Sequence, residues 1–151
     1  MTIATKTDLG GDAWAIDDEV VRLREWGTDL SYALPVDTEV TIGSAETCSL
    51  HLSDPTGCLS RQHARLVREG GRWIAHDLDS KNGMRLDGIR RPKVLLEPGS
   101  ELGVGGITLI AESARLIALR GYLARILGWS SDRSEAVDLA VRSVRLSFLP
   151  G

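Results

Sequence analysis

The sequence predicts an all-β fold, an antiparallel sandwich, that carries a C-terminal α-helical hairpin. From Val20 onward, short runs rich in valine, leucine, isoleucine and tryptophan are interrupted roughly every eight to twelve residues by glycine, proline, aspartate or asparagine, as in a sandwich. After Ser113 the apolar residues recur at intervals of three and four, which is the period of a helix. Two turn signals support the sandwich: Glu69–Gly71 separates two apolar runs, and Asp87–Gly88 follows another.

An N-terminal arm comes first, because residues 1–17 mix threonine, glycine and aspartate with few large apolar side chains. The sandwich is expected over residues 18–112. Residues 113–151 are expected to form the helical hairpin or a linker to a further domain. The expected strands cover residues 19–26, 30–34, 38–43, 48–52, 63–69, 72–78, 83–86, 93–95, 100–103 and 106–111.

Two helices are expected in the C-terminal segment. Their apolar positions are Leu116, Leu119, Leu123 and Ile126 in the first helix, and Val137, Val141, Val144 and Phe148 in the second. Gly128 is placed to end the first helix, and Asp132 with Glu135 forms a capping box at the start of the second. Because a two-helix hairpin has little core of its own, each apolar stripe is expected to pack on the sandwich or on another chain, which would allow self-association.

Composition and charge exclude several classes of protein. The formal net charge of -3 and the pI near 5.6 argue against a surface built to bind nucleic acid. The start of the second helix, "SDRSE", carries acids where a DNA-reading helix would contact bases. The chain has no run of about eighteen apolar residues and no signal peptide. We therefore expect a cytoplasmic protein with reduced cysteines, no membrane partner and no direct nucleic-acid partner.

The stretch "GCLSRQHARL", Gly57–Leu66, places a serine, an arginine and a histidine close together, and three chemistries are conceivable. The first is catalysis, in which Ser60 would act with His63. A serine nucleophile needs a strained turn, an oxyanion hole and a carboxylate that orients the histidine. No G-x-S-x-G or similar context surrounds Ser60, so we expect no catalytic residue and no enzyme.

A metal site is the second alternative, because cysteine and histidine recur as C-x2-H and then C-x4-H between Cys48 and His63. Strand alternation argues against it. It puts Cys48 on the same face as Leu50 and Leu52 and leaves His51 on the opposite face. We therefore expect Cys48 in the core, His51 at the surface, and neither a metal nor another cofactor.

Anion binding is the third alternative, and it needs donors that converge from adjacent loops at one end of the sandwich. The sequence offers the Ser60 hydroxyl, the Arg61 guanidinium and, in "DSKNG", Ser80, Lys81 and Asn82. His63 would then support the loop through hydrogen bonds from its ring to the backbone. The alternative for His63 is a half-exposed strand residue with no such role.

Five segments in succession resemble the forkhead-associated (FHA) domain family over roughly residues 20–112: "VTIGS", "CSLHLSD", "LSRQHARL", "WIAHDLDSKNGMRLDG" and "LEPGSELGVGGITLI". The resemblance implies a β-sandwich that binds phosphothreonine peptides through loops at one end, without cofactor or catalysis. Ser60 and His63 match the S-x-x-H motif of the family, and Asn82 and Gly83 match its N-G motif.

By this resemblance Ser60 would bond the phosphate, with Arg61 beside it and Lys81 as a charged donor from the neighbouring loop. Asn82 would hold the peptide backbone next to the phosphothreonine. The roles implied for Gly43, His63 and Gly83 are architectural. Charged donors and hydroxyls around one anion make stronger hydrogen bonds than neutral pairs do, so this chemistry suits a phosphate.

The sequence departs from the family at three positions. Ser44 stands where the family has a phosphate-binding arginine, Met84 replaces a threonine, and Asp87 replaces an asparagine. A hydrogen bond to a charged group contributes about 1.5 to 3 kcal/mol, so Ser44 implies roughly ten- to hundredfold weaker binding unless Arg61 or Lys81 compensates. The alternative function is a phosphate-independent scaffold or an oligomerisation domain.

The FHA segment followed by helices is also similar to the N-terminal module of bacterial enhancer-binding transcription activators. The expected partner is a protein phosphorylated by a Ser/Thr kinase, and the chain is either a fragment of a longer regulator or a complete stand-alone adaptor. No G-x-x-x-x-G-K motif of a motor domain is present. The expected function is a phosphothreonine-binding interaction module in bacterial signalling or transcription regulation.

Overall fold

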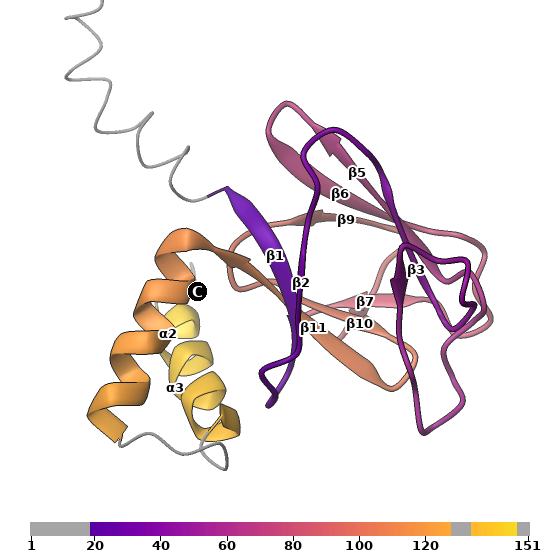
Figure 1. Cartoon of the computed structure of the whole chain (residues 1–151). Coiled ribbons are helices and arrows are strands. Elements are labelled where there is room, and N and C mark those ends of the chain that lie inside the picture. The colour runs from indigo at the N-terminus through magenta and orange to yellow at the C-terminus, as the bar shows by residue number, and fades with distance from the viewer. Residues whose placement is uncertain (1–18, 128–133, 148–151) are drawn as a thin grey trace, which may run out of the picture.

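The computed structural model describes residues 19–127 and 134–147, which form two β-sheets and two helices (Figure 1). The strands are β1 (Val20–Glu25), β2 (Ser31–Ala33), β3 (Val40–Gly43), β4 (Leu50–His51), β5 (Ala64–Glu69), β6 (Arg72–Asp77), β7 (Met84–Leu86), β8 (Ile89–Arg90), β9 (Lys93–Leu96), β10 (Glu101–Val104) and β11 (Ile107–Ser113). The helices are α2 (Ala114–Leu127) and α3 (Ser134–Ser147). The predicted fold class, an all-β sandwich with C-terminal helices, is confirmed.

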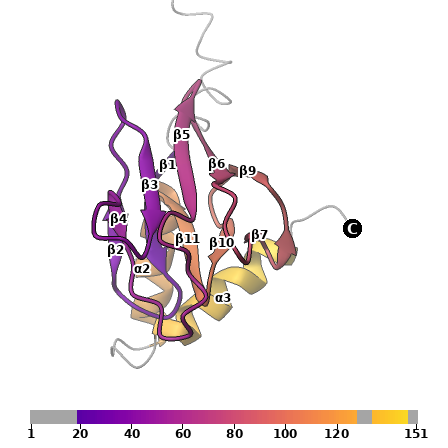
Figure 2. The ribbon, with the colours of Figure 1, turned by 90° about the vertical axis from the view of Figure 1, so that its right-hand side faces the viewer.

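The two sheets have six and five strands. The first has the order β2-β1-β11-β10-β7-β8, and the second has the order β4-β3-β5-β6-β9. In Figure 2 the five-stranded sheet faces the viewer and the helices lie behind the six-stranded sheet. All pairs are antiparallel except β3 with β4, which run parallel. The strand expected over residues 48–52 is shortened to the two residues of β4.

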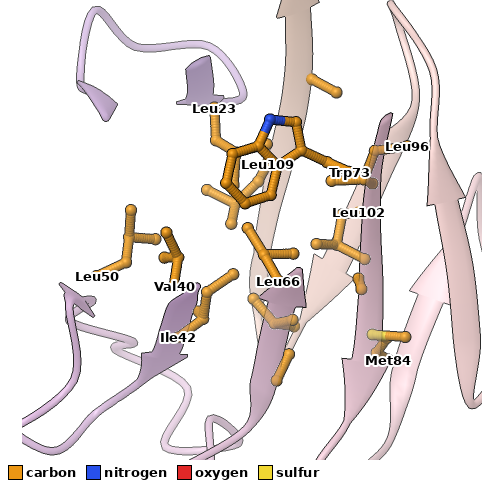
Figure 3. Packing of buried hydrophobic residues seen from close by; sticks show 14 of the residues in the cluster. Leu23, Val40, Ile42, Leu50, Leu66, Trp73, Met84, Leu96, Leu102 and Leu109 are labelled. Atoms are coloured by element: carbon orange, nitrogen blue, oxygen red, sulfur yellow. The ribbon is translucent and has the colours of Figure 1, made fainter. Parts of the chain in front are cut away.

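The core lies between the sheets and follows the period-two alternation of the strands. Trp73 is 1% exposed and lies among leucines from both sheets, including Leu23, Leu66 and Leu109 (Figure 3). Met84 is fully buried in the same cluster. The inward-facing side chains therefore follow the same alternation that predicted the strands.

Two hairpin turns contain residues in the left-handed region. Gly70 and Gly71 have φ values of 59° and 80° and join β5 to β6. Asp87 and Gly88 have φ values of 50° and 88° and join β7 to β8. Two-residue hairpins favour this geometry because it matches the strand twist, so both predicted turns are confirmed. The sequence reasoning missed β8, whose two residues are too few to show a periodic pattern.

Both helices lie against the outer side of the six-stranded sheet (Figure 1). The apolar stripe predicted for the first helix is wrong at Ile126, which is 60% exposed, because the inward face of α2 carries Arg120 and Ala124 instead. On α3, Val137 is buried as expected. The expected residues Gly128, Asp132 and Phe148 lie outside the described residues. Neither α2 nor α3 is long and apolar enough to cross a membrane.

A buried group of charged side chains joins the hairpin to the sandwich. The carboxylate of Asp138 on α3 accepts hydrogen bonds from two nitrogens of Arg24 on β1, from Gly27 N at 2.7 Å and from Arg120 Nε at 3.3 Å. Arg24 Nε also donates to Glu112 on β11 at 3.0 Å. Burial alone would lower the pKa of Arg24, but the bond to Asp138 and the charge of Glu112 raise it above its ordinary value.

A second charged contact lies beside the first. Arg142 on α3 donates to both carboxylate oxygens of Glu101 on β10, at 2.6 and 2.8 Å, and its guanidinium lies 4.0 Å from the ring centroid of Trp26. The bonds to Glu101 raise the pKa of Arg142. The hairpin therefore packs on its own sandwich, which was one of the two expected placements.

Candidate functional site

Three loops meet around Ser60: the β3–β4, β4–β5 and β6–β7 loops. Ser44 N donates to the Ser60 carbonyl at 3.0 Å, and Lys81 N donates to the Ser60 hydroxyl oxygen at 3.0 Å. Ala45 N donates to the Arg61 carbonyl at 3.1 Å. Residues far apart in the sequence, from the "IGS", "SRQH" and "SKNG" segments, are thereby brought to one end of the sandwich.

Gly43 allows the first two of these loops to approach each other. A Cβ atom at this position would lie 2.7 Å from the Arg61 carbonyl carbon and 3.0 Å from Cys48 Sγ. Any larger residue would therefore push the β4–β5 loop away from β3. The requirement for glycine here is steric and does not arise from a positive φ.

His63 links the β4–β5 loop to the β6–β7 loop through both of its ring nitrogens. Its side chain is fully buried, Nδ1 accepts a hydrogen bond from Ser60 N at 3.0 Å, and Nε2 lies 2.7 Å from the Gly83 carbonyl. Because Nδ1 accepts from an N–H group, Nε2 carries the proton and donates to the carbonyl. The alternative in which His63 is half-exposed without a role is therefore wrong. The ring fixes the position of Ser60 relative to the β6–β7 loop.

The β6–β7 loop is held by its own side chains. Asn82 Nδ2 donates to the Cys58 carbonyl at 2.9 Å, which joins this loop to the β4–β5 loop. The Ser80 hydroxyl donates to Asp77 and accepts from Gly83 N at 2.9 Å. Ser80 is buried and its hydroxyl is used within the loop. The prediction that Ser80 donates to a bound anion is therefore wrong.

The exposed donors at this end of the sandwich are cationic. Arg61 and Lys81 are exposed, Ser44 and Ser60 are partly exposed, and neither Arg61 nor Lys81 forms an ion pair with any residue that the structure describes. Two positive charges beside a serine hydroxyl can bind one anion such as a phosphate.

A metal site does not form at this position in the described part of the chain. Cys48 is buried and its Sγ lies 3.1 Å from the Arg61 carbonyl, whereas His51 is exposed. Both nitrogens of His63 are used by backbone groups. Within residues 19–127 and 134–147, no group of three acidic, cysteine or histidine side chains could hold a metal ion.

Asp54 is a structural residue of the site that the sequence reasoning missed. Its carboxylate accepts hydrogen bonds from Gly106 N at 2.9 Å, Thr56 N at 2.9 Å, the Thr56 hydroxyl at 2.7 Å and Cys58 N at 3.0 Å. These bonds, that of Gly106 above all, lower the pKa of Asp54 from 3.8 to about 2. The segment "SDPTG" carries a recognisable signal, since aspartate two residues before threonine is typical of an Asx turn.

Asp54→Asn is expected to loosen the connection between the β4–β5 loop and the β10–β11 turn at Gly106. The amide nitrogen of asparagine cannot accept the bonds that one carboxylate oxygen accepts, so we expect a loss of about 1 kcal/mol in the free energy of unfolding at pH 7. Because the folded-state pKa of Asp54 is lowered, the carboxylate stabilises the fold above pH 3.8, and this contribution is lost as the pH falls towards 2. Urea unfolding across this pH range should show the difference between the two proteins shrinking; a constant difference would contradict the prediction.

Comparisons with known proteins place the site in context. Residues 40–105 match the model of the FHA domain family. A structure from an analysis of phosphothreonine-dependent FHA domain interactions is 23% identical, over 62% of this chain and 95% of that chain, with a TM-score of 0.56. The N-terminal FHA domain of S. cerevisiae Rad53p, in complex with a phosphothreonine peptide, is 23% identical over 62% of this chain and 93% of its own, with a TM-score of 0.54.

Another similar structure is Mycobacterium tuberculosis EmbR in complex with a low-affinity phosphopeptide. It is 24% identical over 74% of this chain, with a TM-score of 0.60, and the match spans 31% of the EmbR chain. At these identities the likeness to solved structures shows a shared fold. A search of curated protein sequences found no match.

Proposed function

The chain contains an FHA domain, and from that premise we propose that it is an interaction module that binds phosphothreonine-containing segments of other proteins, without catalysis. The observation that carries the proposal is the position of Ser60. Its backbone carbonyl accepts from Ser44 N of the β3–β4 loop and its hydroxyl from Lys81 N of the β6–β7 loop, beside exposed Arg61 and Lys81, which form no ion pair with any described residue. A phosphate would accept hydrogen bonds from this set of donors.

Each site residue has a distinct role in this proposal. Ser60 and Arg61 bind the phosphate from the β4–β5 loop, and Lys81 adds a positive charge from the β6–β7 loop. Asn82, whose amide already bonds the Cys58 carbonyl, keeps its side-chain oxygen for a peptide N–H group. Gly43, His63 and Gly83 keep the loops together.

Ser44 determines how strong the binding is. Its backbone N–H is bonded to the Ser60 carbonyl, so a side chain at this position starts next to the proposed phosphate site. A serine there offers a neutral hydroxyl where an arginine would offer a charged, bidentate donor. We expect weaker binding than an arginine would allow, and the phosphate-independent scaffold remains the rival function.

The partner in this proposal is a protein phosphorylated by a Ser/Thr kinase, in bacterial signalling or transcription regulation. The FHA structures that resemble this chain include one bound to a phosphothreonine peptide and one complexed with the intracellular domain of Rv3910. The matched part of EmbR covers 74% of this chain and so extends beyond the family match at residues 40–105.

The proposal predicts that phosphopeptide binding depends on Arg61 and Ser60. Replacing either residue by alanine should weaken binding about tenfold or more, since each removes a donor to a charged group, while Ser44→Arg should tighten it by a similar factor. Arg72→Ala is the matched control, because Arg72 is exposed at the opposite end of the sandwich, beside the β5–β6 turn. Affinities are measured by titration with paired phosphorylated and unphosphorylated threonine peptides.

Equal affinity for the two members of each peptide pair would overturn the proposal and favour the scaffold function. Phosphate-dependent binding that survives both alanine variants would leave the function in place and refute the site. Circular dichroism of each variant shows whether the sandwich is still folded.

A further inference from the structure

Two arginines lie on the outer face of the six-stranded sheet, next to the β6–β7 loop. Arg85 on β7 and Arg90 on β8 are direct cross-strand partners, so their side chains share one face of the hairpin. Like charges in this position repel each other and destabilise a hairpin. Neither arginine forms an ion pair with a residue in the described ranges.

Glycines leave the space that both guanidinium groups occupy. A Cβ atom at Gly83 would lie 2.9 Å from Cζ and 3.0 Å from an Nη atom of Arg90, and a Cβ atom at Gly103 would lie 2.7 Å from Nε of Arg85. Arg85 also donates to the Gly105 carbonyl at 2.6 Å. The guanidinium of Arg90 therefore lies directly beside the residue that follows Lys81 and Asn82.

The positive charge continues past Arg90 along the chain. Arg91 and Lys93 are both exposed, and neither has an ion-pair partner among the residues that the structure describes. The acid of the same hairpin, Asp87, accepts a hydrogen bond from Glu101 N. Arg85 and Arg90 thus adjoin the β6–β7 loop on the outer face of the six-stranded sheet, in a chain whose formal net charge is -3.

We propose that Arg90, with Arg85, is a second anion contact that selects phosphothreonine segments carrying a further negative group on the β6–β7 side. This inference rests on the proposed function. The recognised chemistry is an oxyanion that accepts from a guanidinium, which a glutamate or aspartate side chain or a second phosphate can supply. The repulsion between the two arginines is relieved when such a group binds, so the ligand supplies the missing counter-charge.

The test compares four peptides of equal length on the full chain. The first has one phosphothreonine among neutral residues, and the second has one phosphothreonine among acidic residues. The third has two phosphothreonines among neutral residues, and the fourth is the neutral peptide without phosphate. We expect the acidic peptide, the doubly phosphorylated peptide, or both to bind about fivefold more tightly than the neutral phosphopeptide at low salt, and this preference to decrease at high salt. Which of the two shows the preference distinguishes carboxylate from phosphate recognition.

Arg90→Gln should remove most of this preference while changing the affinity for the neutral phosphopeptide less than about twofold. Arg90 is exposed, so the variant is expected to fold. The control is Arg72→Gln, which removes the same charge at the opposite end of the sandwich. Arg85→Gln should act in the same direction.

Three outcomes would overturn the inference. Equal affinity for neutral and anionic phosphopeptides refutes it and leaves the proposed function intact. A preference that persists in the Arg90→Gln, Arg85→Gln double variant refutes it as well. If the neutral peptide binds equally with and without phosphate, the proposed function fails, and this inference fails with it.

Discussion

Asp138→Ala is expected to lower the free energy of unfolding by about 3 to 5 kcal/mol, the cost of removing one partner from a buried ion pair. Asp138 is 3% exposed and accepts hydrogen bonds from Arg24, Arg120 and Gly27 N. In the variant, the buried Arg24 still pairs with Glu112 but has lost the carboxylate of Asp138, its second counter-charge. Arg120 loses the acid closest to it.

Urea unfolding measures this loss, and hydrogen exchange locates it. If the hairpin leaves the sandwich before the sandwich unfolds, the α3 amides should exchange faster in the variant while those of β5 and β6 keep their protection. Asp37→Ala is the control, because Asp37 is exposed and its loss should change stability by less than about 0.5 kcal/mol. A loss below 1 kcal/mol in Asp138→Ala would show that the charged contact does not fasten the hairpin.

His63→Ala is expected to cost about 2 to 4 kcal/mol of stability and to weaken phosphopeptide binding more than tenfold. The variant leaves Ser60 N and the Gly83 carbonyl without their partner, and it creates a cavity where a fully buried ring had been. Binding weakens because Ser60 is no longer positioned against Lys81 N.

Thermal unfolding and peptide titration are run together on this variant. His51→Ala is the control, since His51 is exposed on β4 and its replacement should affect neither property. Wild-type affinity in a destabilised but folded His63→Ala protein would mean that the ring supports the core and not the site.

The sheets could be predicted because their signals are local, whereas the site residues were proposed from motifs that resemble those of the FHA family. Alternation in "HARLVR" and "RWIAHDL" identifies β5 and β6, and glycines at the turn require the left-handed region that joins them. Two-residue strands such as β4 and β8 carry too few residues for a period to appear. The parallel pairing of β4 with β3 is set by the path of the loop that connects them, and no residue pattern within β4 predicts it.

The class of fold and the two glycine-containing turns could be read from the sequence alone. Those features depend on backbone conformation and on the period of side chains along one element. Only the tertiary structure decided how the hairpin sits on the sandwich. Arg24, Glu112 and Asp138 lie far apart in the chain, and charged residues are ordinarily on the surface, so nothing local marks them as buried partners. These three residues can be buried because each one contacts an opposite charge on another element. That arrangement forms only when the chain has folded.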